Sequence, residues 1–289
     1  MKLPRLPHSW SLTPRQAIAL QQQMAGLVSP NLTRHRIQFI AGLDAAFSKD
    51  DQLCFATAVL WDMRGQRVIE QHTTTRRLAF PYVPGLLSFR EVPSLLAALR
   101  KLKCRPDLLM CDGQGLAHPR RFGLACHLGV ICGLPSLGCA KSRLIGTHTG
   151  LPRPRGSRAA LLDKGEVIGT VLRTQTGIKP VYVSIGHKID LRTAEEIVLA
   201  CAVRHRLPEP TRLADRLVTA FKRDRVGREK RPAGTPSLPR IGRSNRRGAL
   251  NQDADFGSRT GSAETSFAGC SASADPVSVA SSPRRRGQM

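Results

Sequence analysis

Three extended, apolar-rich segments separated only by short polar turns constrain this chain more than any other feature. They are residues 37–47 (IQFIAGLDAAF), 54–63 (CFATAVLWDM) and 67–78 (RVIEQHTTTRRL), and the stretches SKDDQ and RGQ connect them. Turns this short favour antiparallel neighbours, so the three segments predict an antiparallel meander. The 289-residue chain is long enough to bury a sizeable core around such a sheet.

A strand–helix–strand pattern follows the meander. A loop rich in Pro and Gly runs into a helix that we expect to begin near Phe89, with Pro93 in its first turn. The segment DLLMCDG is then a short buried strand, RRFGLACHLGVICGL an apolar helix and PSLGCAKS another strand. This alternation is typical of a parallel crossover.

The remaining segments complete an α/β fold. Residues 13–28 predict a helix that Thr13 caps, with Pro14 at its first position. KGEVIGTVLRT and KPVYVSIGH are strand-like, a helix capped by Thr193 follows, and TRLADRLVTAFKR is the last helix. We therefore predict a mixed sheet, with a three-stranded antiparallel meander followed by parallel crossovers and with helices on both faces.

The charge balance indicates a polyanionic partner. Lys and Arg number 45 against 21 Asp and Glu, which gives a formal net charge of +24. Such an excess favours nucleic acid because each neutralised phosphate releases condensed counterions; a membrane surface or the ribosome are alternatives. From Lys222 onward there are 14 basic and 6 acidic residues, a net +8, so +16 remains for residues 1–221. The body of the chain is therefore basic in its own right.

Composition also suggests where the folded part ends. Residues 224–289 are dominated by Gly, Ser, Pro, Arg and Ala without periodicity, so we predict a disordered basic tail after a catalytic domain of residues 1–223. Such a tail either strengthens nucleic-acid contact or has no function. The eight cysteines form no C-x-x-C pair and sit mostly among apolar neighbours, which favours a reducing compartment.

No segment suggests export or membrane insertion. The N-terminal stretch lacks the apolar core of a signal peptide, and no stretch approaches the roughly 20 apolar residues of a membrane helix. We expect a cytoplasmic, monomeric protein without a membrane partner.

Three carboxylates stand where strands or helices begin or end. Asp44 follows the apolar run of the first strand, Asp112 follows the buried strand LLMC, and Glu91 lies at the start of a helix. Each has a structural explanation: a strand-end Asp turned to solvent, an Asp that caps a turn, and a Glu that opposes the helix dipole. Together they predict a site for Mg²⁺, which prefers carboxylate oxygens, and the ends of parallel strands are where ligands bind in open α/β sheets.

Other polar residues follow strands in the same way. His187 and Lys141 each come just after an apolar strand, where a His can position a water and a Lys can meet a phosphate. His118 and Arg120, with Arg121, either bind phosphate or form a solvated basic edge. In the segment FPYVPGLLSFRE, two prolines bracket Tyr82 and Val83, which predicts a stiff loop that exposes an aromatic wedge.

Several long motifs in this order resemble endonuclease V, the deoxyinosine-specific repair nuclease family. They are IAGLDAAF, FPYVPGLLSFREVP, CDGQGLAHPRRFGLACHLG, GCAKSRLIGTH, LLDKGEVIGTVLRT, KPVYVSIGHKIDL and RLPEPTRLAD, between about residues 13 and 222. The sequence departs from the family at Ala45 and Ala46, where the family often has a larger residue and a hydroxyl, and the segment after residue 223 has no counterpart there.

The resemblance implies an RNase H-like fold and assigns roles to particular residues. Asp44, Glu91 and Asp112 would hold Mg²⁺, or Mn²⁺ as a substitute, with His187 near the attacking water and Lys141 on the phosphate backbone. Tyr82 would be the wedge. The substrate-binding residues suggested by the resemblance and by the residues themselves are Tyr82, Pro84, Gly85, Leu87, Gly113, His118 and Arg120.

The implied reaction is hydrolysis of the second phosphodiester bond on the 3′ side of deoxyinosine, leaving 3′-hydroxyl and 5′-phosphate ends. The partner would be DNA with deoxyinosine or other deaminated or mispaired bases. The same site acting on inosine in single-stranded RNA is the nearest alternative, and a non-catalytic nucleic-acid-binding module is a more distant one. The sequence does not distinguish one metal ion from two.

Overall fold

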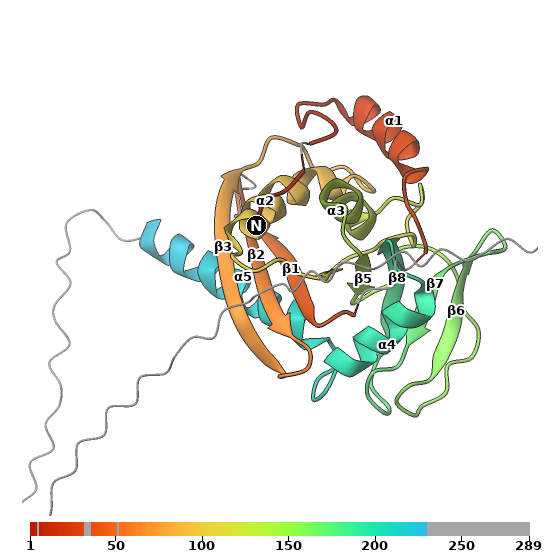
Figure 1. The fold of residues 1–289 in the computed structure, drawn as a ribbon. Coiled ribbons are helices and arrows are strands. Elements are labelled where there is room, and N and C mark those ends of the chain that lie inside the picture. Colours follow the sequence, from red (N-terminus) through yellow and green to blue (C-terminus); the bar gives the residue numbers. More distant parts are fainter. Residues whose placement is uncertain (5, 32–35, 51, 230–289) are drawn as a thin grey trace, which may run out of the picture. The chain divides into compact units, whose positions relative to one another are not determined.

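An eight-stranded mixed sheet forms the centre of the computed structural model, which describes residues 1–229 except 5, 32–35 and 51 (Figure 1). The strand order is β3-β2-β1-β4-β5-β8-β7-β6. The strands are β1 (Phe39–Phe47), β2 (Leu53–Asp62), β3 (Arg67–Arg77), β4 (Leu108–Cys111), β5 (Ser136–Ala140), β6 (Arg158–Asp163), β7 (Glu166–Leu172) and β8 (Val181–His187). The helices are α1 (Pro14–Ala25), α2 (Leu87–Lys101), α3 (Leu124–Cys132), α4 (Leu191–Cys201) and α5 (Glu209–Glu229).

The meander and the first crossovers agree with the sequence prediction. Strands β1, β2 and β3 pair antiparallel, whereas β4 runs parallel to both β1 and β5. The last three strands differ from a continued series of crossovers, because β8 pairs antiparallel with β5, β7 with β8 and β6 with β7. Strand β6 was not predicted, because its sequence RAALLD is a short apolar run without the polar–apolar alternation that marks a half-buried strand.

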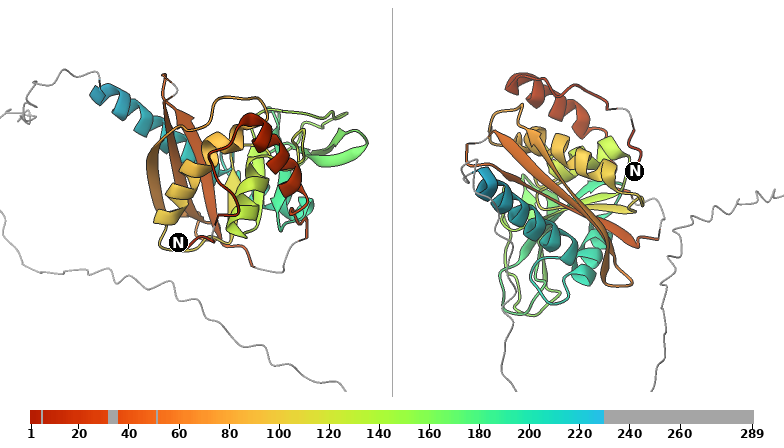
Figure 2. Two further views of the ribbon diagram at one scale, coloured as in Figure 1. Left: turned by 90° about the horizontal axis from the view of Figure 1, so that it is seen from above. Right: turned by 90° about the vertical axis from the view of Figure 1, so that its left-hand side faces the viewer.

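Helices cover both faces of the sheet, as predicted (Figure 2). Leu109 and Cys111 of β4 pack into a core with α2 and α3, whereas Leu108 and Met110 pack into a second core with α4. This alternation follows from the two-residue period of a strand, and it explains why so short a strand is apolar throughout. Helix α5 packs on β1 and β2.

A glycine allows α5 to approach β1 closely. A methyl group at Gly42 would lie 2.2 Å from the carbonyl carbon of Pro210, in the first turn of α5. Since ordinary contacts of such a carbon begin near 3.4 Å, only glycine permits this distance. Further along the helix, the ring of Phe221 contacts that of Phe55, with centroids 6.0 Å apart. The start of α5 is therefore fixed relative to β1.

The ends of three helices refine the sequence predictions. Thr13 caps α1 in a capping box with Gln16, as predicted. Helix α2 begins at Leu87 rather than near Phe89, so Pro93 lies inside the helix and not in its first turn. Asp190, not Thr193, caps α4: its carboxylate accepts hydrogen bonds from the backbone N–H and the hydroxyl of Thr193. Thr193 lies inside the helix and contributes an unpaired N–H group to its first turn, and an acceptor that precedes the helix satisfies this group.

Helix α5 continues to Glu229, so residues 224–229 belong to this helix rather than to the predicted tail. The rest of that tail, residues 230–289, lies outside the described residues. Among the helices that the structure describes, none combines the length and apolar character needed to cross a membrane.

Candidate active site

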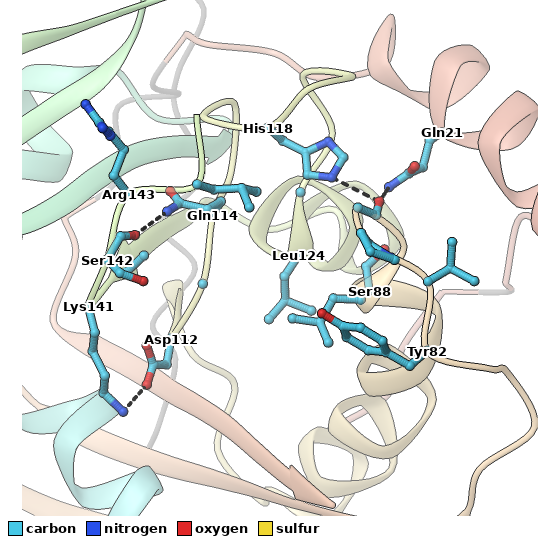
Figure 3. Close-up of a pocket in the computed structure, with 18 residues that line it drawn as sticks. Gln21, Tyr82, Ser88, Asp112, Gln114, His118, Leu124, Lys141, Ser142 and Arg143 are labelled. Atoms are coloured by element: carbon cyan, nitrogen blue, oxygen red, sulfur yellow. Dashed lines mark hydrogen bonds and ion pairs between the residues drawn. The ribbon is translucent and has the colours of Figure 1, made fainter. Parts of the chain in front are cut away.

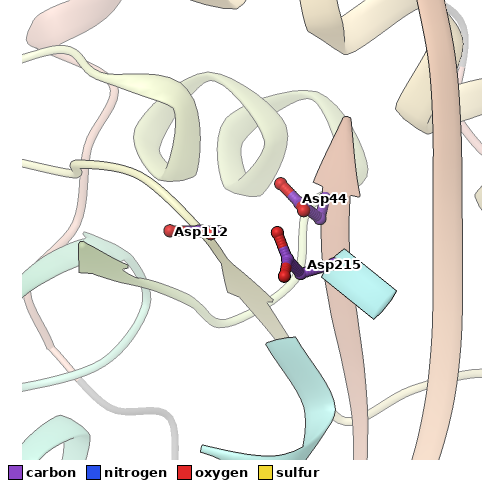
Figure 4. A group of neighbouring side chains, drawn as sticks. All are labelled: Asp44, Asp112 and Asp215. Atoms are coloured by element: carbon purple, nitrogen blue, oxygen red, sulfur yellow. The ribbon is translucent and has the colours of Figure 1, made fainter. Parts of the chain in front are cut away.

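Three aspartates from three different elements converge at the carboxyl ends of β1 and β4 (Figure 4). Asp44 lies within β1, Asp112 directly follows β4, and Asp215 lies in α5. One carboxylate oxygen from each lies within 4.8 Å of the other two. Successive side chains of a strand point to opposite faces of the sheet, and those of Asp44 and Asp112 point to the face that α5 covers. This direction brings them to Asp215.

The electrostatics of this cluster favour a bound cation. Burial, and next the charge of Asp112, raise the pKa of Asp44 to about 8. Burial also raises the pKa of Asp112, although the hydrogen bond and charge of Lys141 offset part of that effect. Carboxylates held this close repel one another when ionised, so a divalent cation that binds oxygen ligands would relieve the repulsion. The donor set therefore fits Mg²⁺.

Lys141 supplies a positive charge between two of the carboxylates. Its ammonium nitrogen lies 2.6 Å from Oδ2 of Asp112 and 3.1 Å from Oδ1 of Asp215. Burial works against the charge, but the hydrogen bond and charge of Asp112, and then those of Asp215, raise the pKa of Lys141. Lys141 thus remains a cation at the edge of the cluster, and its side chain is still partly exposed.

Glu91 adjoins the cluster but is not one of the three carboxylates that come together. It lies in the second turn of α2, because that helix begins at Leu87, and its side chain is almost fully buried. Burial raises its pKa well above the usual value, and the charges of Asp44 and Asp112 raise it further. Electrostatic coupling to both aspartates places Glu91 beside them, on the α2 side of the sheet.

Asp215 was not predicted from the sequence, although one signal was available. The buried residues Thr211, Ala214 and Val218 mark the inward face of α5, and Asp215 follows Thr211 by four residues and precedes Val218 by three. Residues at these spacings share a helix face. An aspartate on the inward side of an amphipathic helix is a candidate ligand for the same reason as a strand-end aspartate.

The structure does not bring His187 to the carboxylate cluster. Strand β8 runs antiparallel to β5, so His187 pairs with Ser136 at the start of β5, whereas Lys141 follows the other end. The four residue steps of β5 separate these ends by about 13 Å at roughly 3.3 Å per residue. His187 instead accepts a hydrogen bond from the backbone N–H of Ser29 through Nδ1, at 3.2 Å.

A pocket of about 400 Å³ lies next to the carboxylates and reaches Asp112 and Lys141 (Figure 3). Tyr82 stands on one side and Lys141 on the other. Tyr82 is 68% exposed, as the prolines around it predicted, and the guanidinium of Arg90 lies 5.8 Å from its ring centroid. Six of the seven residues predicted to bind substrate line this pocket, and Arg120 is the exception. The six are Tyr82, Pro84, Gly85, Leu87, Gly113 and His118.

Three side chains hold the carbonyl oxygen of Gly85 and thereby fix the loop that carries Tyr82. Donors are Nε2 of Gln21 at 3.1 Å, Nε2 of His118 at 3.0 Å and Nη2 of Arg120 at 2.7 Å. Gly85 has a φ of 77°, a conformation that glycine adopts without a steric penalty. Arg120 also donates from Nε to Oε1 of Gln21 at 2.6 Å. We call Gln21, His118 and Arg120 the Gly85 clamp.

His118 and Arg120, which were predicted to bind phosphate or to form a solvated basic edge, make their hydrogen bonds within the clamp. Nδ1 of His118 accepts from the backbone N–H of Arg120, so Nε2 carries the proton that is donated to Gly85. Burial, and next the charge of Arg120, lower the pKa of His118 to about 4, so the ring is neutral near pH 7. Arg121 pairs with Asp163 and Glu166 at 2.8 Å each. All three side chains are thus engaged within the protein, His118 and Arg120 at the loop and Arg121 at Asp163 and Glu166.

Comparisons with known proteins match most of the chain to the family that its sequence motifs resemble. The family model for endonuclease V matches residues 21–216. An endonuclease V of Nostoc sp. is 46% identical over 214 residues, which are 74% of this chain and 97% of that protein.

Two solved structures extend the likeness to the fold. The crystal structure of the Streptomyces avermitilis endonuclease V has a TM-score of 0.73 and 41% identity, and the match covers 78% of this chain and all of that one. A Ciona intestinalis endonuclease V, crystallised with a 23mer DNA that contains an inosine followed by a ribo-adenosine, has a TM-score of 0.66 and 25% identity and covers 74% and 99% of the two chains. The α/β sheet described above is thus the RNase H-like fold of these proteins. The chain belongs to the endonuclease V family.

Proposed function

We propose that this protein is a metal-dependent endonuclease that hydrolyses the second phosphodiester bond on the 3′ side of deoxyinosine in DNA. The observation that carries the proposal is the convergence of Asp44, Asp112 and Asp215 beside a pocket with an exposed Tyr82 at its rim. Membership of the endonuclease V family and the inosine-containing DNA bound by the Ciona protein support the substrate class.

Asp44, Asp112 and Asp215 would hold Mg²⁺, with Glu91 adjacent, and Mn²⁺ would fit the same oxygen ligands. When bound, the metal lowers the pKa of a water and stabilises charge on the phosphoryl oxygens. Lys141 extends a charged nitrogen over the same cluster, where it neutralises part of the phosphate charge.

The remaining residues select and present the nucleotide. Extracting a base from a duplex leaves a gap in the stack, and the exposed ring of Tyr82 on its clamped loop is suited to fill that gap. Extraction costs a few kcal/mol and least for a mispaired base, so the wedge favours deaminated bases before any contact in the pocket is made.

The test compares three oligonucleotides of one sequence, with a single deoxyinosine, a single inosine in RNA, or deoxyadenosine at the same position. We expect Mg²⁺-dependent cleavage of the deoxyinosine strand and none of the deoxyadenosine strand. Preferred cleavage of the RNA would replace the proposal with the endoribonuclease alternative. Equal cleavage of all three would refute lesion recognition, and binding without cleavage in any metal would indicate a non-catalytic module.

A further inference from the structure

A series of three hydrogen-bonded side chains connects the N-terminal segment with the pocket. Nε2 of His8 lies 2.9 Å from Nε2 of His127 in α3, and Nδ1 of His127 lies 3.0 Å from the hydroxyl oxygen of Ser88 in α2. Ser88 lines the pocket, on the same side as Tyr82 (Figure 3). At its other end, Nδ1 of His8 lies 2.8 Å from the carbonyl oxygen of Ser9. This series of hydrogen bonds therefore runs from the pocket to the N-terminal segment.

The partners at each step determine the direction of every hydrogen bond. The carbonyl of Ser9 can only accept, so the proton of a neutral His8 is on Nδ1 and its Nε2 is an acceptor. His127 must then donate from Nε2, which leaves its Nδ1 as an acceptor. Ser88 therefore donates its hydroxyl proton to His127, and the remaining lone pairs of its oxygen accept hydrogen bonds. In this state Ser88 is an acceptor, not a donor, toward a ligand.

The surroundings of His127 keep this arrangement dry. His127 is fully buried, and its ring lies within 5.5 Å, centroid to centroid, of Trp10, Phe89 and Phe122. Burial, and next the neighbouring His8, lower the pKa of His127 to about 3. His8 is the one charged or titratable group among the described residues that shifts this pKa, and the other rings around it are apolar. A neutral imidazole without water must satisfy both nitrogens through His8 and Ser88.

We propose that the Ser88 hydroxyl reads the ring N–H of a deaminated base, and that His127 and His8 are positioning residues that hold Ser88 in the accepting state. The inference rests on the proposed function, since it places the base in the pocket. Hypoxanthine carries a hydrogen on N1, whereas N1 of adenine is an acceptor. An accepting oxygen in the pocket therefore pairs with hypoxanthine and faces a lone pair of adenine, which leaves both acceptors unsatisfied.

The test measures binding of single-strand oligonucleotides to the full chain by fluorescence anisotropy in EDTA. Three bases are compared at one position: hypoxanthine, 6-thiohypoxanthine, which keeps the ring N–H, and nebularine, which has neither a ring N–H nor a keto group. We expect Ser88→Ala to weaken binding of the first two roughly three- to tenfold and not to weaken binding of the third, because N1 of nebularine is an acceptor that an accepting Ser88 does not satisfy. Ser94→Ala is the matched control, since Ser94 is a buried serine of the same helix that does not line the pocket.

A second arm tests the positioning role of His8. In His8→Ala, Nε2 of His127 loses the acceptor that fixes the direction of these hydrogen bonds, so the preference for hypoxanthine over nebularine should be weaker than in the wild type. A structural role of His8 would change stability but would not move this ratio between two bases.

The outcomes separate this inference from the proposed function. If the wild type does not distinguish deoxyinosine from deoxyadenosine, the proposed function fails. If it does, equal penalties of Ser88→Ala on all three bases overturn the inference. A penalty on hypoxanthine without one on 6-thiohypoxanthine overturns it too, because Ser88 would then donate to the keto oxygen. A preference for hypoxanthine over nebularine that is undiminished in His8→Ala overturns the role of His8.

Discussion

Substitution of Gly42 by alanine tests how the third carboxylate is brought to the other two. The added methyl group would lie 2.2 Å from the backbone of Pro210, and ordinary contact requires about 3.4 Å, so α5 must move away from β1 by roughly 1.2 Å. Asp215 lies in the second turn of the same helix and moves with it. A misplacement on the order of 1 Å costs about a hundredfold in rate.

We therefore expect Gly42→Ala to lower single-turnover cleavage of a deoxyinosine oligonucleotide about a hundredfold. Overpacking should also reduce the free energy of unfolding by about 1–3 kcal/mol, measured by urea denaturation. Gly169→Ala in β7 is the matched control, because its methyl group would meet the backbone oxygen of Val183 at 2.4 Å, outside the pocket. This control should lose similar stability and keep its cleavage rate.

Two outcomes would refute the reasoning. Folded Gly42→Ala protein that cleaves at the wild-type rate would show that the position of α5 does not matter for the reaction. An equal loss of cleavage in Gly169→Ala would show that any strain in the sheet lowers activity, and the specific link between Gly42 and Asp215 would then be lost.

Four further predictions concern the cluster, the loop and its clamp. Asp215→Asn should lower Mg²⁺-dependent cleavage at least a hundredfold and keep DNA binding within a few-fold, and a rate within tenfold of wild type would remove Asp215 from the site. The pKa of Asp44 is raised to about 8, so the metal-free folded protein keeps a proton that the unfolded chain releases near pH 3.8. The free energy of unfolding of the metal-free protein should therefore fall as the pH rises between these two values. Mg²⁺ should raise the melting temperature more at pH 8 than at pH 5. Tyr82→Ala should reduce cleavage of duplex deoxyinosine more than that of a single strand, since only the duplex needs a wedge, and equal losses would contradict this role. Gln21→Leu should raise KM with little change in kcat, because the clamp positions the pocket loop, and an unchanged KM would show that His118 and Arg120 suffice.

Much of the fold was predicted from local sequence patterns, because its turns and crossovers depend on residues that are neighbours in the sequence. The meander follows from short turns, and the β4–α3–β5 crossover follows from apolar runs that one helix separates. Pairing between distant segments leaves no such pattern. The antiparallel return of β8 against β5 is invisible in its own sequence, and this is why His187 was expected beside the metal but lies at the other end of the sheet.

The site was predictable in part for the same reason. Asp44 ends the apolar run of β1 and Asp112 directly follows β4, so each was recognisable as a candidate ligand from its own segment, and the parallel pairing of β1 with β4 brings them together. Asp215 reaches them only because α5 crosses β1 at Gly42, a contact between residues far apart in the chain. The clamp is similar, since Gln21 comes from α1, and no motif connects that helix with the carbonyl of Gly85.

The most direct test of the metal centre is cleavage of DNA with one deoxyinosine, mapped to the nucleotide, by the wild type and by Asp44→Ala and Asp112→Ala. We predict one Mg²⁺-dependent cut by the wild type, at the second phosphodiester bond 3′ of the lesion, with 3′-hydroxyl and 5′-phosphate ends. Both variants should bind the DNA and fail to cut it. Mg²⁺-dependent cleavage that persists in both variants would contradict the assignment of the carboxylate cluster.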